Sequence, residues 1–549
     1  MKEVREDKEW GAERLCATDR KNRWSKSEFG RIGTNVVRMS ATTAWDPRVS
    51  EGRGGGAKES HENDGPERGG RRARRARGTG RRGGDEVAVT CRRYGVTDLG
   101  DVIGVSTTFA HHIYLNSLDA VTELLEKRAG VTSDRPPNTM IKDLSMGWSQ
   151  GVALHAHDER HKKMRRVIAS ALHPAAARSY AQQHMDNTLT FVRNISGSPR
   201  MFKEHTKNAI GAFILRMTYG HIVTKDDTFI SLIHEAVHYF ALGVGKHYWV
   251  NDIPLLKYVP SWVPGAGFQK VAARGKELRN QYASEPFDKV LEQIRHNQLS
   301  RVSYTSRLLE EKGGGNASPE DIDLIKWTAA AMYLAGSTTT LHIVVVLFFM
   351  MALYPEVAQR AQAEIDTVVG RGRLPGFTDR ESMPYMEALL QELMRVSPPT
   401  PLGFPHAATE DIEFRGYRIP KGASINPNVW AILHDPKHYP SPHTFTPDRY
   451  LKSVPDPDPR RFNFGFGRRV CPGLHVANDT AWVMCAAVLA SFDIHAGSEL
   501  SRRVRELGGR ESPRLYELYE GFGGGLPLAF EYNITIRDKA AAELLESSA

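Results

Sequence analysis

The ten residues Phe464–Gly473, which read FGFGRRVCPG, constrain the chain more than any other segment. Three glycines surround one cysteine, Cys471, and residues 474–492 after them are predicted to form a long helix. Glycines let the backbone turn tightly, so that amide N–H groups can approach the sulfur. The helix N-terminus and the cations Arg468 and Arg469 add positive charge. The segment is therefore expected to hold a thiolate whose pKa is lowered.

A thiolate at Cys471 serves either as a nucleophile or as a metal ligand, and a buried structural cysteine is a third interpretation. A nucleophile needs a histidine base nearby, and the one histidine close to the segment is His475, in the helix that follows. The spacing of five residues resembles the haem-binding signature of the cytochromes P-450: Phe464, Gly467, Arg469, Cys471 and Gly473. The resemblance implies that Cys471 is the axial ligand of the iron of haem b, iron protoporphyrin IX. It also implies that Phe464 packs beside the haem and that Arg469 pairs with a propionate.

A second part of the resemblance concerns a charge cluster. Glu392 and Arg395 are three residues apart on a predicted helix, residues 382–396, so both side chains lie on one face. Taken alone, they are an ordinary surface ion pair. They resemble the Glu-x-x-Arg of the cytochromes P-450, which the family pairs with an arginine in a segment like Phe445–Tyr450. The resemblance implies that Arg449 completes a buried structural triad behind the cysteine segment.

A patch of small and hydroxyl residues, Ala335–Thr340, interrupts a long apolar helix. Small residues let a flat ligand approach the helix backbone, although close packing of two helices is an alternative interpretation. The patch resembles the oxygen-binding groove of the family, which implies catalytic roles for Ala335, Gly336, Thr338, Thr339 and Thr340. Thr339 matches the threonine that supports proton delivery. Thr338 stands where the family usually has an acid, so Ser337 and Thr340 with water are alternative proton routes.

Three further residues are haem contacts by resemblance. Arg165 matches a propionate-binding arginine on a basic helix, residues 157–172, and His161 replaces the tryptophan that usually precedes it. His406 follows a proline-rich stretch, residues 398–405, and matches the position of another propionate contact. Taken alone, it would be interpreted as an ordinary loop histidine. The same basic helix carries three further cations, Lys162, Lys163 and Arg166. They form either a docking surface for an acidic reductase or merely a solvated face.

Apolar spacing and prolines predict a mainly α fold with small β-sheets, whose longer helices cover residues 157–172, 323–354, 356–369, 382–396 and 474–492. Strand patterns cover residues 104–116 and 412–420. The apolar run Leu341–Leu353 has 13 residues, and a membrane span needs about 20, so we expect a buried central helix. The resemblance implies the cytochrome P-450 fold, with haem between this helix and the cysteine segment with the last helix.

The N-terminal part of the chain has a different composition. Residues 1–95 hold 23 Lys and Arg against 15 Asp and Glu, which accounts for +8 of the formal net charge of +9. Gly and Arg dominate residues 52–84, so we expect residues 1–95 to be a disordered basic tail and residues 96–549 to be the haem-thiolate catalytic domain. The tail is either a natural arm or the product of wrongly assembled first exons. Four scattered cysteines exclude a disulfide framework.

The resemblance implies a monooxygenase that inserts one oxygen atom from O2 into an apolar small molecule. The electrons would come from NADPH through a separate cytochrome reductase, with cytochrome b5 as a further partner. A peroxide-driven or non-redox haem-thiolate enzyme is an alternative, and RNA binding through the Arg/Gly tail is a minor one; we expect no nucleic-acid partner.

A likeness of Asp252–Gly267 to fungal, multi-substrate members of the O-methylsterigmatocystin-oxidoreductase kind points to secondary metabolism or xenobiotic oxidation. The resemblance also implies the endoplasmic reticulum membrane, whereas the sequence itself shows no anchor helix and by itself indicates a soluble, cytoplasmic protein. Mean hydropathy of −0.42 excludes a polytopic membrane protein.

Overall fold

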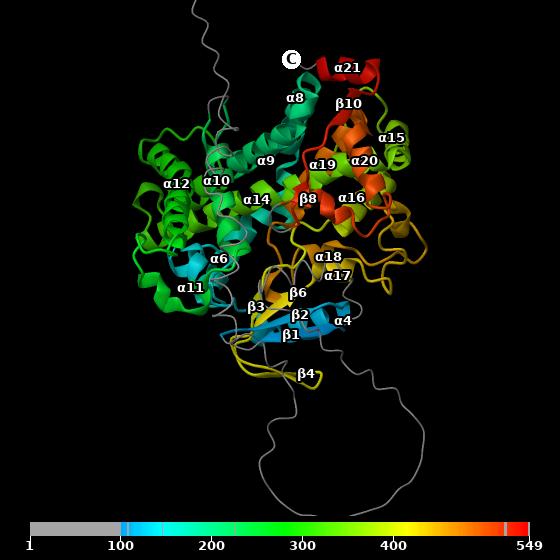
Figure 1. Ribbon diagram of the computed structural model, residues 1–549. Helices are drawn as coiled ribbons and strands as arrows, with labels where there is room; N and C mark the ends of the chain where they lie inside the picture. The colour runs from blue at the N-terminus through cyan, green and yellow to red at the C-terminus, as the bar shows by residue number, and fades with distance from the viewer. Residues whose placement is uncertain (1–99, 107–108, 145–146, 225–226, 521–523, 547–549) are drawn as a thin grey trace, which may run out of the picture. The chain divides into compact units, whose positions relative to one another are not determined.

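The computed structural model describes residues 100–549, apart from residues 107–108, 145–146, 225–226, 521–523 and 547–549. The predicted tail, residues 1–95, lies outside the described residues. The described part is mainly helical with small sheets, as predicted (Figure 1). Its α-helices are α4 (Leu118–Val121), α5 (Ala129–Thr132), α6 (Glu159–Leu172), α7 (Pro174–Ser179), α8 (Ala181–Gly197), α9 (Phe202–Tyr219), α10 (Phe229–Gly245), α11 (Trp249–Asp252), α12 (Phe268–Arg295), α13 (Tyr304–Glu311), α14 (Pro319–Leu353), α15 (Pro355–Val368), α16 (Pro384–Val396), α17 (Val429–Leu433), α18 (Arg460–Asn463), α19 (Leu474–Ser491), α20 (Ser498–Glu506) and α21 (Lys539–Glu546).

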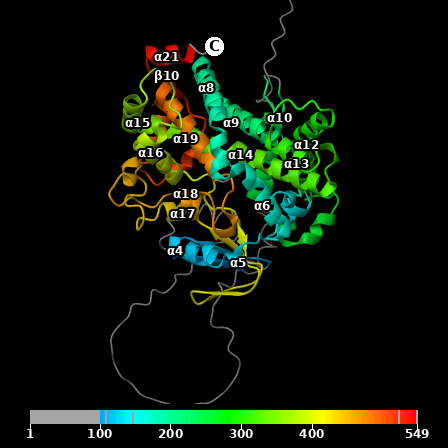
Figure 2. The same ribbon diagram turned by 180° about the vertical axis from the view of Figure 1, so that it is seen from behind.

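The longest helix, α14, runs through the middle of the described part (Figures 1 and 2). It starts where Ser318 accepts a hydrogen bond from the N–H of Asp321 at 3.1 Å, and it ends before Pro355. The apolar run Leu341–Leu353 is almost wholly buried, and 67% of the most apolar window of α14 lies inside the protein. Among the described helices α14 alone is long and apolar enough to span a membrane, but its burial identifies it as a core helix.

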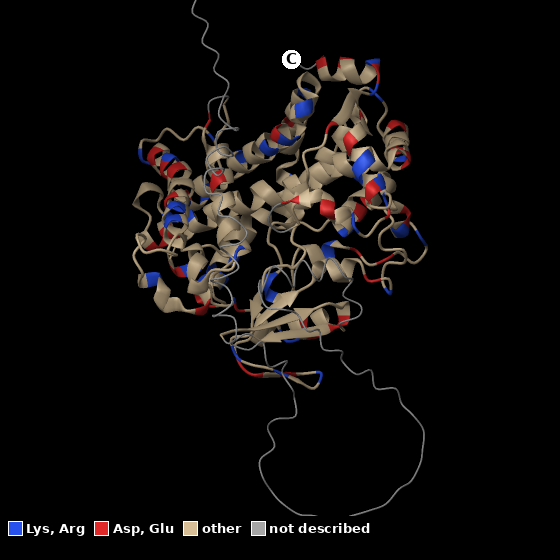
Figure 3. Cartoon of the chain, viewed as in Figure 1, with Lys and Arg blue, Asp and Glu red and all other residues tan. Residues whose placement is uncertain are grey.

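Helices α9, α12, α16 and α19 surround α14, so the core is a layer of apolar side chains between helices. Figure 3 shows the difference in charge: acidic and basic residues mark the outer helices, whereas the central helix is mostly uncharged. Helices α6 and α16 begin two residues later than the sequence pattern predicts, whereas α14 and α15 begin earlier. Helix α6 begins at Glu159 because Asp158 caps it, accepting from the N–H of His161 at 2.9 Å.

The strands form one sheet of four and three sheets of two. The larger sheet has the order β1 (Val102–Ser106), β2 (His111–Leu115), β6 (Ser424–Pro427) and β3 (His406–Ala407). Strand β2 pairs parallel with β6, and the other two pairs are antiparallel. The two-strand sheets join β4 (Ile412–Phe414) to β5 (Tyr417–Ile419), β7 (Phe492–Ala496) to β10 (Tyr532–Ile536), and β8 (Tyr519–Glu520) to β9 (Leu526–Pro527).

Candidate haem-thiolate site

The cysteine segment turns between α18 and α19 through two residues in the left-handed backbone region. Gly465 and Gly467 have φ of 82° and 56°, which side chains other than glycine rarely adopt. The N–H of Cys471 donates to the carbonyl of Phe464 at 2.7 Å, which closes the turn. At Gly467 a Cβ atom would lie 2.3 Å from the carbonyl oxygen of Leu125. Glycine is therefore needed there both for conformation and for space.

The electrostatics of Cys471 differ from the sequence-based expectation. Burial raises the pKa of the Cys471 thiol, and a hydrogen bond from the Gly473 N–H and the charge of Arg165 only partly oppose this. Arg469, expected to lower the thiol pKa, instead directs its guanidinium to backbone carbonyls. The thiol is thus protonated unless a further positive charge acts on it, and a coordinated metal ion supplies such a charge.

Two buried guanidinium groups lie side by side near the cysteine segment, one predicted and one not. Arg469 donates to the carbonyls of Ser133, Val152 and His155 at 2.7, 3.3 and 2.8 Å. Arg135, which the sequence analysis did not single out, donates to the carbonyls of Ala153, Phe404 and Pro405 at 2.8, 3.1 and 2.6 Å. These contacts join the segments around residues 133, 153 and 405 to the cysteine segment.

No carboxylate among the described residues forms an ion pair with Arg135, Arg165 or Arg469. Burial lowers the pKa of Arg469 to about 10, with a smaller contribution from the charge of Arg165. Burial and the charge of Arg469 lower the pKa of Arg135 to about 9. Asp134 opposes both shifts without forming an ion pair with either group. The cluster is therefore an excess of buried positive charge, which favours an anionic partner.

Two predicted histidines lie in the same neighbourhood. His161 is 1% exposed, and neither of its ring nitrogens has a hydrogen-bond partner among the described residues. Burial, together with the charges of Arg469 and Arg165, lowers its pKa to about 3. His406 is also buried, and one ring nitrogen lies 2.9 Å from the carbonyl of Thr132. Burial and the charge of Arg135 lower the pKa of His406 to about 3. Both rings are therefore neutral, and His161 has nitrogens left for another group.

The small-residue patch on α14 divides between two faces of the helix. Ala335 and Thr339, one helical turn apart, are exposed, and the Thr339 hydroxyl donates to the Ala335 carbonyl at 3.1 Å. Gly336 instead packs against α9, because a Cβ atom there would lie 2.7 Å from Cδ1 of Ile214. Ser337 is buried, with its hydroxyl 2.6 Å from the carbonyl of Tyr333. Close packing, the alternative interpretation, thus describes Gly336, while Ala335 and Thr339 form an open surface.

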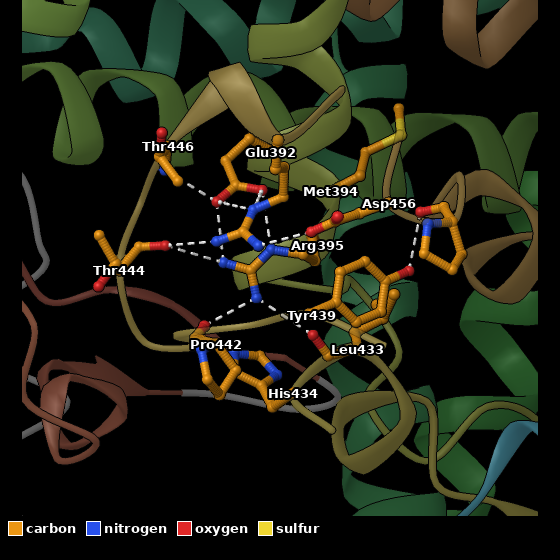
Figure 4. Close-up of polar contacts among 12 residues, drawn as sticks. Glu392, Met394, Arg395, Leu433, His434, Tyr439, Pro442, Thr444, Thr446 and Asp456 are labelled. Atoms are coloured by element: carbon orange, nitrogen blue, oxygen red, sulfur yellow. Dashed lines mark hydrogen bonds and ion pairs between the residues drawn. The ribbon is translucent and has the colours of Figure 1, made fainter. Parts of the chain in front are cut away.

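Glu392, Arg395 and Arg449 meet in one buried cluster (Figure 4). The Glu392 carboxylate accepts two hydrogen bonds from Arg395, at 2.8 and 2.9 Å, and one from Arg449 at 3.1 Å. It also accepts from the N–H of Thr446 at 2.9 Å. Asp456, which the sequence analysis did not predict, accepts from Arg449 at 2.9 Å. The cluster ties α16 to the segment that leads into the cysteine segment.

Comparison with known proteins settles which family shares these features. The family model described as Cytochrome P450 matches residues 87–508, most of the chain. The chain belongs to the cytochrome P450 family. Cytochrome P450 monooxygenase COX2 of Coprinopsis cinerea is 38% identical over 72% of this chain and 76% of its own length. Cytochrome P450 monooxygenase 176 of Postia placenta is 34% identical over 82% and 87%. The tryptamine 4-monooxygenase of Psilocybe cyanescens is 35% identical over 72% and 79%.

The family places this P450 among the oxidoreductases that incorporate oxygen, with haem as the cofactor. The residues of this chain fit that group. The positive cluster has no ion-pair partner in the described part, which suits the two carboxylates of haem. His161 has two buried ring nitrogens without partners among the described residues, and Cys471 offers a thiol three residues before α19. The only sequence signal for Arg135 is its position before two prolines, which does not reveal a ligand-binding role.

Replacing Gly467 by alanine tests the geometry of the cysteine segment. The new Cβ meets the Leu125 carbonyl at 2.3 Å, so we expect a loss of about 2–4 kcal/mol of stability and weaker haem retention. Gly370→Ala is the matched control, because Gly370 also has a positive φ, 77°, but has no atom within 4 Å of the added Cβ. It should cost only about 1 kcal/mol. Equal unfolding temperatures for the two variants would contradict the close contact.

Proposed function

We propose that this P450 monooxygenase inserts one oxygen atom from O2 into an apolar small molecule, with electrons from NADPH that a separate reductase delivers. The observation that carries the proposal is the thiol of Cys471 at the start of α19, beside an unpaired cluster of buried arginines. The names of the relatives support the reaction class. The similarity to these fungal relatives supports a role in secondary metabolism.

The proposed roles of the residues follow from their contacts. Cys471 would hold the haem iron through its sulfur, and a thiolate ligand would supply the electron density that favours O–O cleavage. Phe464, whose carbonyl accepts the hydrogen bond from the Cys471 N–H, would pack beside the haem. The propionates would be held by arginines that form no ion pair among the described residues and by neutral histidines: Arg135, Arg165, Arg469, His161 and His406. Gly473 contributes its N–H to the sulfur, which favours the thiolate.

On α14, Thr339 is the proposed proton-handling residue. Its hydroxyl hydrogen is directed to the Ala335 carbonyl, so its oxygen lone pairs remain available to a water molecule on the exposed side. Ser337 is a poor alternative, because its hydroxyl is buried and already donates to Tyr333. Thr340 is buried as well, whereas Thr338 is half-buried and carries no acid. We therefore propose that water beside Thr339, rather than an acid at position 338, supplies the proton.

The electron donor would dock on α6. Lys162, Lys163 and Arg166 are exposed on this helix, and only Lys162 has an ion-pair partner among the described residues, Glu159 at 2.6 Å. A cluster of exposed cations attracts an acidic partner over distances of about 10 Å. The same helix carries His161 and Arg165 on its inner side, so the proposed docking surface lies directly behind the proposed haem contacts.

Replacing Cys471 by alanine tests the ligand assignment. The reduced wild-type protein with carbon monoxide should absorb at about 450 nm, and the variant should lose this thiolate band. Cys485→Ala is the control, because Cys485 is buried inside α19 away from the turn. A band that persists in the Cys471 variant would contradict the assignment. Turnover with peroxide but not with NADPH and reductase would favour the peroxide-driven alternative, which the missing acid at position 338 motivates.

Replacing Thr339 by alanine tests the proton route. We expect at least a tenfold fall in product formed per O2 consumed, with hydrogen peroxide released instead, because a positioned proton donor contributes about 10²-fold or more. Thr367→Ala is the matched control: its hydroxyl makes the same contact one turn back, at 2.8 Å from the Ala363 carbonyl, on the exposed face of α15. Unchanged coupling in the Thr339 variant would refute the assignment.

Membrane association stays a prediction, and exposed apolar side chains support it. Trp249, Leu255, Tyr258 and Trp262, in and after α11, are 65–80% exposed. Aromatic side chains of this kind favour the membrane–water interface. We expect the Trp249→Ser/Trp262→Ser variant to bind phospholipid vesicles roughly tenfold more weakly in co-sedimentation. Val302→Ser, at a position 74% exposed elsewhere on the surface, should bind as wild type does. Equal binding by all three proteins would contradict the prediction.

A further inference from the structure

The buried cluster around Glu392 does not balance its own charge. Arg395 and Arg449 each carry one positive charge, whereas Glu392 carries a single negative charge, and the three side chains are between 0% and 2% exposed. An excess charge held away from water is strongly unfavourable unless a counterion lies close by. The family's triad therefore needs a further negative group in this chain.

Asp456 provides that charge. Its carboxylate accepts from Nη1 of Arg449 at 2.9 Å, and its side chain is only 9% exposed. Its backbone N–H donates to the carbonyl of Arg449 at 3.1 Å, so the two residues are joined twice. Lys452 also lies 3.4 Å from the carboxylate, but its side chain is 51% exposed and remains hydrated. Two carboxylates then face two guanidinium groups, and the cluster is neutral.

The cluster organises a long segment that has little regular structure of its own. The two guanidinium groups donate to four carbonyls from the end of α17 to the turn Pro447–Tyr450: Leu433, Pro442 and Thr444, which Figure 4 labels, and Pro440. Because little regular secondary structure holds its backbone, this segment depends on hydrogen bonds from the arginines for its conformation. The arginines in turn depend on both carboxylates, because each guanidinium must be neutralised to remain buried.

The segment leads directly into the cysteine turn. Asp456 lies three residues before Pro459, the residue that precedes α18. The side chain of Asn463 at the end of α18 donates to the carbonyl of Met394 on α16 at 2.9 Å. The next residue, Phe464, accepts the hydrogen bond from Cys471. A shift of Asp456 would therefore be transmitted over a short, tethered stretch to the position of the sulfur.

We propose that Asp456 is the fourth member of the Glu392–Arg395–Arg449 cluster, and that by neutralising it Asp456 positions the thiol of Cys471 for haem. The inference rests on the proposed role of Cys471. It makes Asp456 a positioning residue, because its carboxylate acts through Arg449 and touches neither the sulfur nor the substrate.

Asp456→Asn in the full-length, haem-loaded protein tests the proposal, because asparagine keeps the shape and a hydrogen-bond acceptor but removes the charge. We expect at least half of the carbon monoxide-binding haem to lose the thiolate band at about 450 nm. We also expect the unfolding temperature to fall by roughly 5 °C or more. Asp448→Asn is the matched control. Asp448 lies on the same segment as Asp456 and forms an ion pair with Arg360 of α15, but its side chain is 51% exposed. This variant should change neither reading.

Asp456→Glu separates charge from shape. Glutamate restores the negative charge, so this variant should recover most of the thiolate band even where the asparagine variant fails to fold. If the glutamate and asparagine variants behave alike, or if the asparagine variant keeps the full band and unfolding temperature, the proposal is wrong. If the wild-type protein itself lacks the thiolate band, the role of Cys471 fails instead, and the unfolding temperatures alone then decide whether Asp456 neutralises the cluster.

Discussion

The rest of the site depends on the hydrogen bonds and ion pairs of the Glu392 carboxylate. This buried carboxylate accepts hydrogen bonds from two arginines and from a backbone N–H. Because the arginines reach it from α16 and from the turn Pro447–Tyr450, ion pairs fix a helix and an irregular segment to each other. The cysteine turn follows that segment, so the position of the sulfur depends on a carboxylate far away in sequence.

The second constraint is steric. Gly467 lets the turn approach the Leu125 carbonyl, and Gly336 lets α14 approach α9 at Ile214. Both glycines were singled out in the sequence for a ligand, yet each is required by contact with another part of the protein. At Gly467 this contact sets the depth of the cysteine turn. At Gly336 it sets the distance between two core helices, which fixes the face of α14 that bears Ala335 and Thr339.

Local signals predicted the fold well. Prolines indicated where helices end, as at Pro355 after α14, and the strand pattern predicted over residues 104–116 overlaps β1 and covers β2. The two-residue turn Arg415-Gly416, with φ of 52° and 79°, closes the predicted strand pair β4–β5. The site was predicted less completely. Arg135 and Asp456 have no distinctive spacing, and their roles come from burial beside charges that are distant in sequence. The expected lowering of the Cys471 pKa was wrong, because a sequence does not reveal how deeply a thiol is buried.

The carbonyl-bound arginines have a consequence for assembly of the protein. Arg135 and Arg469 repel each other, and their hydrogen bonds go to backbone carbonyls such as those of Ser133, Ala153 and Phe404, while the charge of Asp134 offsets the repulsion only in part. A dianionic ligand that binds the folded chain and not the unfolded one would relieve this repulsion and shift the folding equilibrium by mass action. Folding and cofactor uptake would thereby be linked, and the supply of haem in the cell would help to set how much of this protein is folded.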